Sequence, residues 1–402
     1  MDFEDTPEEA AYRAEVRDWL KANALDFPQG ARIGVNESKQ WQKIKAAAGY
    51  AAITWAKEYG GMGGTSMQNV IYGQEEAKYN LPGSVFLIGV GMAMPMLMVH
   101  GTDEHKQRFI KPALYGDEIW CQLFSEPGAG SDLAGVRARA EKDGDEWIVN
   151  GHKIWTSGAH YSDWAILVTR SDPEAAKHKG LTFFLVDMKT PGISVKRIKQ
   201  ISGQSHFNEV FLENVRIPDA NRVGAVGDGW KVALTVLMNE RSAVGNLGIT
   251  VGIDELIQLA RDVELYDGPA INNMAVREKI ADWHVQAQGL KYTKFRSLTA
   301  ISKGQTPGPE NSITKAVSAP RRQDMSAFAM ELMDMGGIIR DPDLSPFRAA
   351  FNEDWFSAPG MRIAGGTDEI LRNIIAERVL KLPGEIRVDN KLPFNQLPSG
   401  RS

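Results

Sequence analysis

The sequence has little cysteine, no excess of positive charge and no long uninterrupted apolar run, and each lack excludes a class of protein. The single cysteine, Cys121, cannot form an internal disulfide, which favours a reducing compartment. The 46 Lys and Arg residues against 51 Asp and Glu give a net charge of −5, so nucleic acid is not an expected partner. The longest apolar run, residues 85–99, is broken by Gly89, Gly91 and Pro95, which predicts a buried helix rather than a membrane span.

Several catalytic motifs are also missing. The seven histidines are scattered, without His-Glu-x-x-His or paired cysteines, which argues against a metal hydrolase. No Gly-x-Ser-x-Gly segment supports a serine hydrolase. Neither a Walker loop nor a Gly-x-Gly-x-x-Gly segment is present. The segment of residues 1–5 carries three acidic side chains and resembles neither a signal peptide nor an Arg-rich transit peptide. We therefore expect a cytoplasmic protein without membrane insertion.

The composition that is present is ordinary for a globular protein, with 43% hydrophobic and 24% charged residues. Its pattern changes twice along the chain, from helical periodicity to short strands and back. Thr6-Pro7 before an amphipathic stretch predicts the start of the first helix. Strands bounded by Asp-Gly, Asn-Gly and Pro-Gly turns are predicted at residues 147–149, 164–169, 181–186 and 209–212.

These patterns predict an α+β fold of three domains and a tail. We expect an N-terminal α-helical domain over residues 1–117 and a central domain of short strands over residues 118–227, whose pattern is typical of a barrel or a sandwich. A C-terminal domain of long helices follows over residues 228–385, and residues 386–402 form a Pro-rich tail.

Glu240 is conspicuous because it stands where helical periodicity requires a hydrophobic residue. Residues 229–247 predict one helix, and Glu240 projects into its apolar stripe, whose other members are Val232, Val236, Ala243 and Leu247. A carboxylate in apolar surroundings tends to have a raised pKa, which suits a general base. The alternative is a structural carboxylate paired with a neighbouring helix or with Arg241.

A glycine-rich block lies at the entrance to the strand region. Residues 121–132 contain Ser125-Glu126-Pro127-Gly128-Ala129-Gly130-Ser131-Asp132, whose glycines allow backbone N–H groups to turn toward an anion such as a pyrophosphate. Two further segments are distinctive: Gly151-His152-Lys153-Ile154-Trp155-Thr156-Ser157, and Gly365-Gly366-Thr367-Asp368-Glu369-Ile370 near the C-terminus.

These three segments together resemble the acyl-CoA dehydrogenase family of flavoproteins, over essentially the whole chain. The resemblance implies that the central domain is a β-barrel and the C-terminal domain a four-helix bundle, with FAD held between them. It implies that residues from Gln122 to Ser131 wrap the flavin, Phe124 and Gly130 among them, with Ser125 bonding its pyrimidine edge. The remaining expected cofactor contacts are Trp155 against the isoalloxazine, Ser157 toward N5, Thr367 and Glu369 near the adenosine half, and Gly336 and Gly337 from a neighbouring subunit.

The family places its catalytic Glu at one of two positions, and this sequence distinguishes them. In one subgroup the Glu immediately precedes the Gly-Thr pair, where this chain has Gly365 at the corresponding place. In the isovaleryl- and long-chain-like subgroup the base lies on the first bundle helix before an Arg, as in Glu240-Arg241. The resemblance therefore implies Glu240 as the α-proton base, with hydride passing from Cβ to flavin N5 and a trans-2-enoyl-CoA as product. The Gly365 N–H would polarise the thioester carbonyl, while Ser131 and Arg241 would contact the acyl-CoA.

The resemblance also implies partners. We expect an electron-transfer flavoprotein as electron acceptor, and a homodimer, homotetramer or α2β2 heteromer as assembly. The sequence departs from the family at residues 263–269, which replace an Arg-x-x-Phe-Gly segment, at Met333, and in an insertion over residues 341–360. These departures resemble bacterial subgroups that act on bulky, cyclic, sterol-side-chain or dicarboxylic acyl-CoAs. Two alternatives stay open: an oxygen-using flavoenzyme of this fold, and a weakly catalytic subunit of a heteromer.

Overall fold

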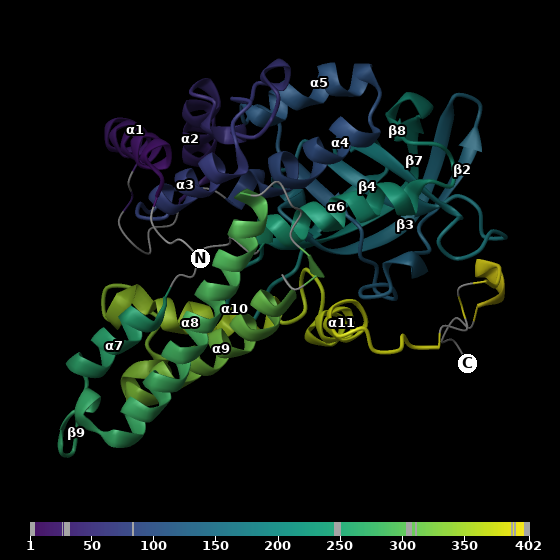
Figure 1. Ribbon diagram of the computed structural model, residues 1–402. Coiled ribbons are helices and arrows are strands. Elements are labelled where there is room, and N and C mark those ends of the chain that lie inside the picture. Colours follow the sequence, from purple (N-terminus) through teal and green to yellow (C-terminus); the bar gives the residue numbers. More distant parts are fainter. Residues whose placement is uncertain are drawn as a thin grey trace. The chain divides into compact units, whose positions relative to one another are not determined.

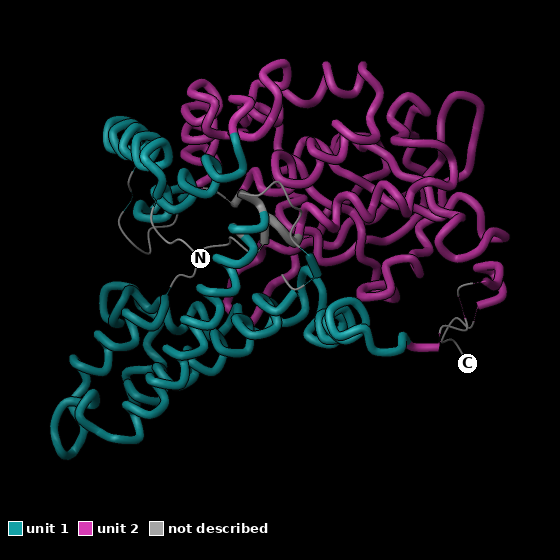
Figure 2. Tube along the Cα trace, viewed as in Figure 1, with its two compact units in different colours: residues 1–33, 65–81, 245–384 teal, residues 34–64, 82–244, 385–402 magenta. Residues whose placement is uncertain are grey.

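The computed structural model describes residues 5–25, 27, 33–82, 84–244, 251–302, 308–309, 312–386, 389 and 391–397. Contacts within the chain define two compact units, shown in teal and magenta in Figure 2. Unit 1 comprises residues 1–33, 65–81 and 245–384, and unit 2 comprises residues 34–64, 82–244 and 385–402. The four domain ranges expected from the sequence stay a prediction.

Unit 1 is helical. Its helices are α1 (Pro7–Asn23), α3 (Ser66–Glu76), α7 (Ile253–Asp262), α8 (Met274–Ser302), α9 (Ser312–Leu332), α10 (Ala350–Met361) and α11 (Asp368–Ile374) (Figure 1). The predicted start of α1 is confirmed, because Thr6 and Glu9 form a reciprocal capping box, with Glu9 N donating to Thr6 Oγ1 at 3.3 Å. Leu256, Trp283 and Phe351 belong to the core that joins the later helices.

A short hairpin occupies the segment that departs from the family pattern. Strands β9 (Glu264–Leu265) and β10 (Gly268–Pro269) pair antiparallel between α7 and α8. Tyr266 at the tip is fully exposed.

Unit 2 joins helices to one eight-stranded sheet. The helices are α2 (Val35–Ala47), α4 (Met94–His100), α5 (Asp103–Leu114) and α6 (Gly229–Val244). The strands are β1 (Trp120–Leu123), β2 (Arg139–Asp143), β3 (Glu146–Ser157), β4 (Trp164–Arg170), β5 (Leu181–Asp187), β6 (Ile193–Arg197), β7 (Phe207–Pro218) and β8 (Arg222–Val223). Their order is β6-β7-β3-β2-β4-β5-β8, and β1 pairs parallel with β4.

All four predicted strands are confirmed, as β3, β4, β5 and β7, while the other four strands of this sheet were not predicted. Strand β2, for example, has the sequence Arg-Ala-Glu-Lys-Asp with only Ala140 buried, so it lacks the apolar alternation that marks a strand. Backbone pairing with β3 makes it a strand, and that is a property of the fold rather than of the segment.

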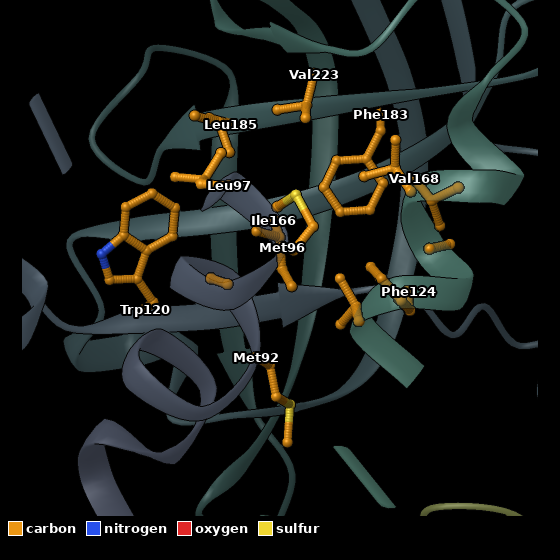
Figure 3. Packing of buried hydrophobic residues seen from close by; sticks show 14 of the residues in the cluster. Met92, Met96, Leu97, Trp120, Phe124, Ile166, Val168, Phe183, Leu185 and Val223 are labelled. Carbon is orange, nitrogen blue, oxygen red and sulfur yellow. The ribbon is translucent and has the colours of Figure 1, made fainter. Parts of the chain in front are cut away.

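The predicted buried helix at residues 85–99 is a succession of helical pieces. A turn at Ser84–Phe86 precedes a π-helical stretch at Gly89–Ala93, which continues into α4. Gly89 allows a close approach, since a Cβ there would lie 3.3 Å from Cδ1 of Trp120. Met96 and Leu97 of α4 pack with Phe183 of β5 in the core shown in Figure 3. None of the described helices combines the length and apolar composition that crossing a membrane requires.

Candidate active site

Trp155 has an unusual backbone conformation that turns its side chain outward. Along β3, Trp147, Val149 and Lys153 are buried, so alternation would also bury residue 155. Instead Trp155 has φ of 61°, the pairing with β7 is irregular between Lys153 and Thr156, and the alternation reverses. Trp155 is therefore 56% exposed while Thr156 is buried. A left-handed conformation at a bulky residue costs on the order of 1–3 kcal/mol, and such strain concentrates at functional sites.

Phe207 contacts Trp155, and Ser157 lies two residues after it in β3. The ring of Phe207 meets Trp155 edge-on, with centroids 6.0 Å apart and planes at 88°. Ser157, the last residue of β3, is exposed. The Oγ1 atom of Thr156 is buried without a hydrogen-bond partner.

Lys153 fastens the glycine-rich loop to β3. Its side chain is completely buried, and its Nζ donates to Glu126 Oε1 at 2.8 Å and to the Phe124 and Val168 carbonyls at 3.0 and 2.8 Å. The Ile154 N–H donates to the Ser125 carbonyl at 2.9 Å. Burial lowers the pKa of Lys153, an effect that the Glu126 carboxylate opposes. The loop and Trp155 are therefore held in one local geometry.

The glycine-rich loop has exposed backbone at its two glycines. Residues Glu126 and Ala129 close a tight turn through two backbone hydrogen bonds of 2.9 and 3.0 Å. Gly128 and Gly130 are exposed, and a Cβ added at either would meet no atom within 4 Å. In the described part of the chain, no backbone carbonyl accepts a hydrogen bond from the N–H groups of Gly128, Gly130 and Ser131. These donors belong to exposed residues of a glycine-rich turn, which suits an anionic ligand.

Two residues expected to contact the cofactor, Gln122 and Phe124, lie in strand β1 and directly after it, where the glycine-rich loop begins. Phe124 is only 4% exposed, and its ring packs edge-on against Phe183 with centroids 5.8 Å apart (Figure 3). The Phe124 side chain is therefore part of the core, and its backbone carbonyl accepts a hydrogen bond from Lys153 Nζ. Gln122, in β1, is half-buried opposite Ile166 of β4.

The C-terminal segment that contains Asp389 and Phe394 folds against the end of the glycine-rich loop at Asp132. Phe394 is 6% exposed and lies under the guanidinium groups of Arg170 and Arg137, whose carbons are 3.7 and 5.0 Å from its ring centroid. The Phe394 N–H donates to the Ala175 carbonyl at 3.0 Å. Arg170 also donates to the Ala134 carbonyl, just beyond the loop, and burial lowers the pKa of Arg170 to about 10.

Lys177 connects this segment to the loop by charge. Its ammonium lies 2.7 Å from Asp132 Oδ2 and also pairs with Asp389. The Lys177 side chain is 8% exposed, so the two carboxylates share one largely buried cation. The glycine-rich loop is thus held at Glu126 by Lys153 and at Asp132 by Lys177.

Glu240 lies on α6 at the expected place in its stripe. Val236 and Val232, one and two turns before it, are completely buried, and Glu240 is half-buried. Helix α6 packs against β5 and against the Gly89–Ala93 stretch. The side chains of Arg241 and Ala243, together with Leu247, lie outside the described residues.

The expected site residues of unit 1 fall on two turns. Gly365, with φ of 62°, precedes Thr367, whose Oγ1 caps α11 by accepting from Ile370 N at 3.2 Å. Glu369, in the first turn of α11, is exposed. Gly336 and Gly337 form a separate turn after α9. A Cβ at Gly337 would lie 2.2 Å from the Met330 carbonyl oxygen, so no larger residue fits there.

The geometry of unit 2 fits a dinucleotide cofactor with a flat ring system. N–H donors on exposed residues of the glycine-rich loop suit a pyrophosphate, and the exposed indole of Trp155 offers a face for an aromatic ring. Within the described ranges, no group of three or more His, Cys, Asp and Glu side chains could hold a metal ion.

Comparison with known proteins identifies the class. Residues 6–117, 121–215 and 227–380 match the N-terminal, middle and C-terminal domains of acyl-CoA dehydrogenase. The chain belongs to the acyl-CoA dehydrogenase family and is an oxidoreductase of this class. The predicted fold class is thereby confirmed.

Two similar relatives come from Mycobacterium tuberculosis. Acyl-CoA dehydrogenase IpdE1 of Mycobacterium tuberculosis is 34% identical over 392 residues, which are 94% of this chain and 98% of the relative. Acyl-CoA dehydrogenase FadE34 of the same organism is 38% identical over 355 residues, and the match covers 47% of its length, so this chain spans about half of that relative.

Solved structures agree on the fold. A chain of the Tcur3481-Tcur3483 steroid ACAD is similar at a TM-score of 0.83 with 27% identity, over 96% of this chain and 100% of that one. A chain of the ChsE4-ChsE5 complex from Mycobacterium tuberculosis gives a TM-score of 0.79 with 28% identity, over the same shares of the two chains.

Proposed function

We propose that this protein dehydrogenates an acyl-CoA thioester between Cα and Cβ, giving a trans-2-enoyl-CoA, with Glu240 as the α-proton base and FAD as cofactor. The observation that carries the proposal is the outward-turned, strained Trp155 beside the open glycine-rich loop, because it fits a flavin ring and its pyrophosphate together. The half-buried Glu240, one turn after the buried Val236, supports the choice of base.

The proposal gives each residue a separate task. The Glu240 carboxylate accepts the α proton, and the apolar stripe of α6 limits its hydration, which strengthens it as a base. The Gly365 N–H donates to the thioester oxygen as negative charge develops there. Ser131 and Arg241 hold the acyl-CoA. When bound, FAD supplies at N5 the acceptor for the two electrons that leave Cβ.

The remaining cofactor contacts follow the family. We assign Gln122, Phe124 and Ser125 with Gly130 and Ser131 to the flavin and pyrophosphate, with Phe124 acting through its backbone. Trp155 and Ser157 face the ring system, and Thr367 and Glu369 face the adenosine half. Gly336 and Gly337 serve a cofactor bound mainly by a neighbouring chain.

The geometry of α9 supports this division of the cofactor contacts between two chains. Lys315, in its first turn, contacts the turn around Gly365, while Met330, near its end, contacts Gly337. The 15 residues from 315 to 330 span about 22 Å at a rise of about 1.5 Å per residue. Within one chain the two glycine turns therefore lie at opposite ends of a helix. We expect at least a dimer, as a homodimer, a homotetramer or an α2β2 heteromer.

The substrate and the electron acceptor are inferred from relatives. Similarity to the Tcur3481-Tcur3483 steroid ACAD favours a bulky acyl-CoA, with sterol-side-chain thioesters as the leading candidates. We propose an electron-transfer flavoprotein as acceptor. The cytoplasmic location likewise stays a prediction.

The test is anaerobic bleaching of the flavin by a panel of acyl-CoAs. The purified chain is expected to carry noncovalent FAD and to lose its flavin absorbance with at least one sterol-side-chain, cyclic, dicarboxylic or straight-chain thioester. Rapid reoxidation by air would favour an oxygen-using enzyme instead. A chain that binds no flavin, even when co-expressed with candidate partner subunits, would refute the proposal.

A further inference from the structure

Lys315 contacts the turn that contains Gly365. It lies in the first turn of α9, and its Nζ donates to the carbonyl oxygens of Ala364 and Gly366. These two carbonyls flank Gly365 on either side. Both Gly365 and Gly366 have positive φ, 62° and 96°, so the turn uses a conformation that glycine adopts easily and leaves as easily.

The ends of the turn are fixed by other groups. Asp368 N donates to the Arg362 carbonyl at 3.1 Å, and Arg362 Nε donates to Asp368 Oδ2 at 2.7 Å. Thr367 then caps α11. The two glycines between these anchors have no side chains of their own. Lys315 is thus the side chain that reaches the middle of the turn from α9.

The contact with Ala364 determines where the Gly365 N–H points. The Ala364 C=O and the Gly365 N–H belong to one planar peptide group and point in opposite directions. A cation bound to that oxygen fixes the plane and directs the N–H away from the ammonium. It also polarises the peptide group, which makes the N–H a stronger donor.

We propose that Lys315 is a positioning residue that aims and strengthens the Gly365 N–H as a donor to the thioester oxygen of the acyl-CoA. The inference rests on the proposed function. Lys315 touches neither substrate nor cofactor in this scheme and acts only through the peptide group between Ala364 and Gly365. Its loss lets the glycine turn relax and weakens carbonyl polarisation, while Glu240 and the flavin-binding loop stay intact.

The first arm of the test observes the peptide group directly. The sequence contains four Ala–Gly pairs, at 48–49, 129–130, 134–135 and 364–365. Labelling deuterated protein with [1-13C]alanine and [15N]glycine therefore restricts a carbonyl–amide NMR correlation to these four signals, and Ala364→Ser identifies the one of interest. We expect Lys315→Met to move the Ala364 carbonyl and Gly365 amide resonances and to leave the other three pairs in place. Lys315→Arg, which keeps a cation, is expected to move the same two resonances by less than Lys315→Met does.

The second arm is kinetic. The assay is single-turnover reduction by an acyl-CoA that bleaches the wild-type flavin. We expect Lys315→Met to slow this reduction on the order of 10- to 100-fold, which does not exceed the effect of removing an oxyanion donor completely. FAD content and acyl-CoA affinity are expected to stay near wild type. Lys294→Met removes an exposed lysine from α8 and serves as the control, with no change in either arm.

The outcomes separate the two proposals. Unmoved 364–365 signals in Lys315→Met, or moved signals with an unchanged reduction rate, overturn the role of Lys315. If no acyl-CoA bleaches the wild-type flavin, the proposed function fails, while the NMR arm still decides whether Lys315 sets this peptide group. Should Lys315→Met not fold, Lys315→Gln removes the charge with the same expected results.

Discussion

Lys153 and Glu126 form an ion pair of 2.8 Å in which the lysine side chain is completely buried. The pair joins strand β3, which turns Trp155 outward, to the glycine-rich loop, which exposes its N–H groups. Two backbone N–H groups, from Arg137 and Ala138, complete the coordination of the carboxylate at 2.7 and 2.9 Å. Together with the hydrogen bond from Ile154 N–H to the Ser125 carbonyl, this buried pair holds the loop next to the part of β3 that contains Trp155.

Breaking this pair from one side is expected to be costly. Glu126→Gln leaves the Lys153 ammonium buried without its counter-charge, and we expect a loss of about 3–5 kcal/mol in the free energy of unfolding. Urea unfolding and the flavin-to-protein ratio measure the effect. The double variant Glu126→Gln with Lys153→Met removes the charge as well and should recover part of the loss. Wild-type stability in the single variant would contradict the structural account.

Phe394 is expected to hold the C-terminal segment against the loop. Phe394→Ala removes the ring that Arg170 and Arg137 cover, and we expect a loss of roughly 1–3 kcal/mol, with faster release of FAD. Leu392→Ala, two residues away and 43% exposed, is the matched control. Equal rates of flavin release from the two variants would show that the segment does not support the loop.

Glu75 makes the stability of unit 1 sensitive to acid. Burial favours its neutral form, but hydrogen bonds from Arg17, Lys78 and Arg13 outweigh this and lower its pKa from 4.5 to about 2. A carboxyl with a depressed folded-state pKa stabilises the protein above its unfolded pKa, and this contribution is lost as pH falls through the folded value. The loss is therefore expected between pH 4.5 and about pH 2.

The measurement is chemical unfolding as a function of pH. At pH 7, Glu75→Gln is expected to cost on the order of 1–3 kcal/mol and to flatten the pH dependence in that window. Glu15→Gln, an exposed residue on α1, is the control. A wild-type slope in Glu75→Gln would contradict the assignment.

Cys121 is expected to be inert in the folded protein. Its side chain is completely buried in the sheet core, and burial raises the thiol pKa to about 12, so the reactive thiolate is scarce at neutral pH. A colorimetric thiol reagent should react with the native chain only as fast as the protein unfolds, and at once in denaturant. Rapid reaction of the native protein would show that the strand β1 is not packed as described.

Much of this fold could be predicted from the sequence because the relevant signals are local. Thr6-Pro7 gave the start of α1, and apolar stretches with turn residues at their ends gave β4 and β5. Strand β2 was missed because its sequence is polar, and pairing with β3 makes it part of the sheet. Strand β6 was missed although Ile193 and Val195 alternate with polar residues, because the alternation is only two apolar residues long.

The details of the site depended on longer-range contacts. Period-two alternation along β3 already puts Lys153 on the face of Trp147 and Val149, so a buried lysine was open to inference from the sequence. The reversal at Trp155 was not, because it follows from irregular pairing with β7. The contacts of Lys315 and Phe394 join residues far apart in the chain and have no sequence signal.

The most direct test of the proposed function is anaerobic flavin reduction by Glu240→Gln. The substitution keeps the shape and hydrogen bonding of the side chain and removes its basicity. With an acyl-CoA that bleaches the wild-type flavin, we expect FAD and ligand to bind normally and the reduction rate to fall about 10²- to 10⁴-fold. Lys231→Met, exposed on the same helix, should reduce at the wild-type rate. A near-normal reduction rate in Glu240→Gln would contradict the assignment of Glu240 as the base.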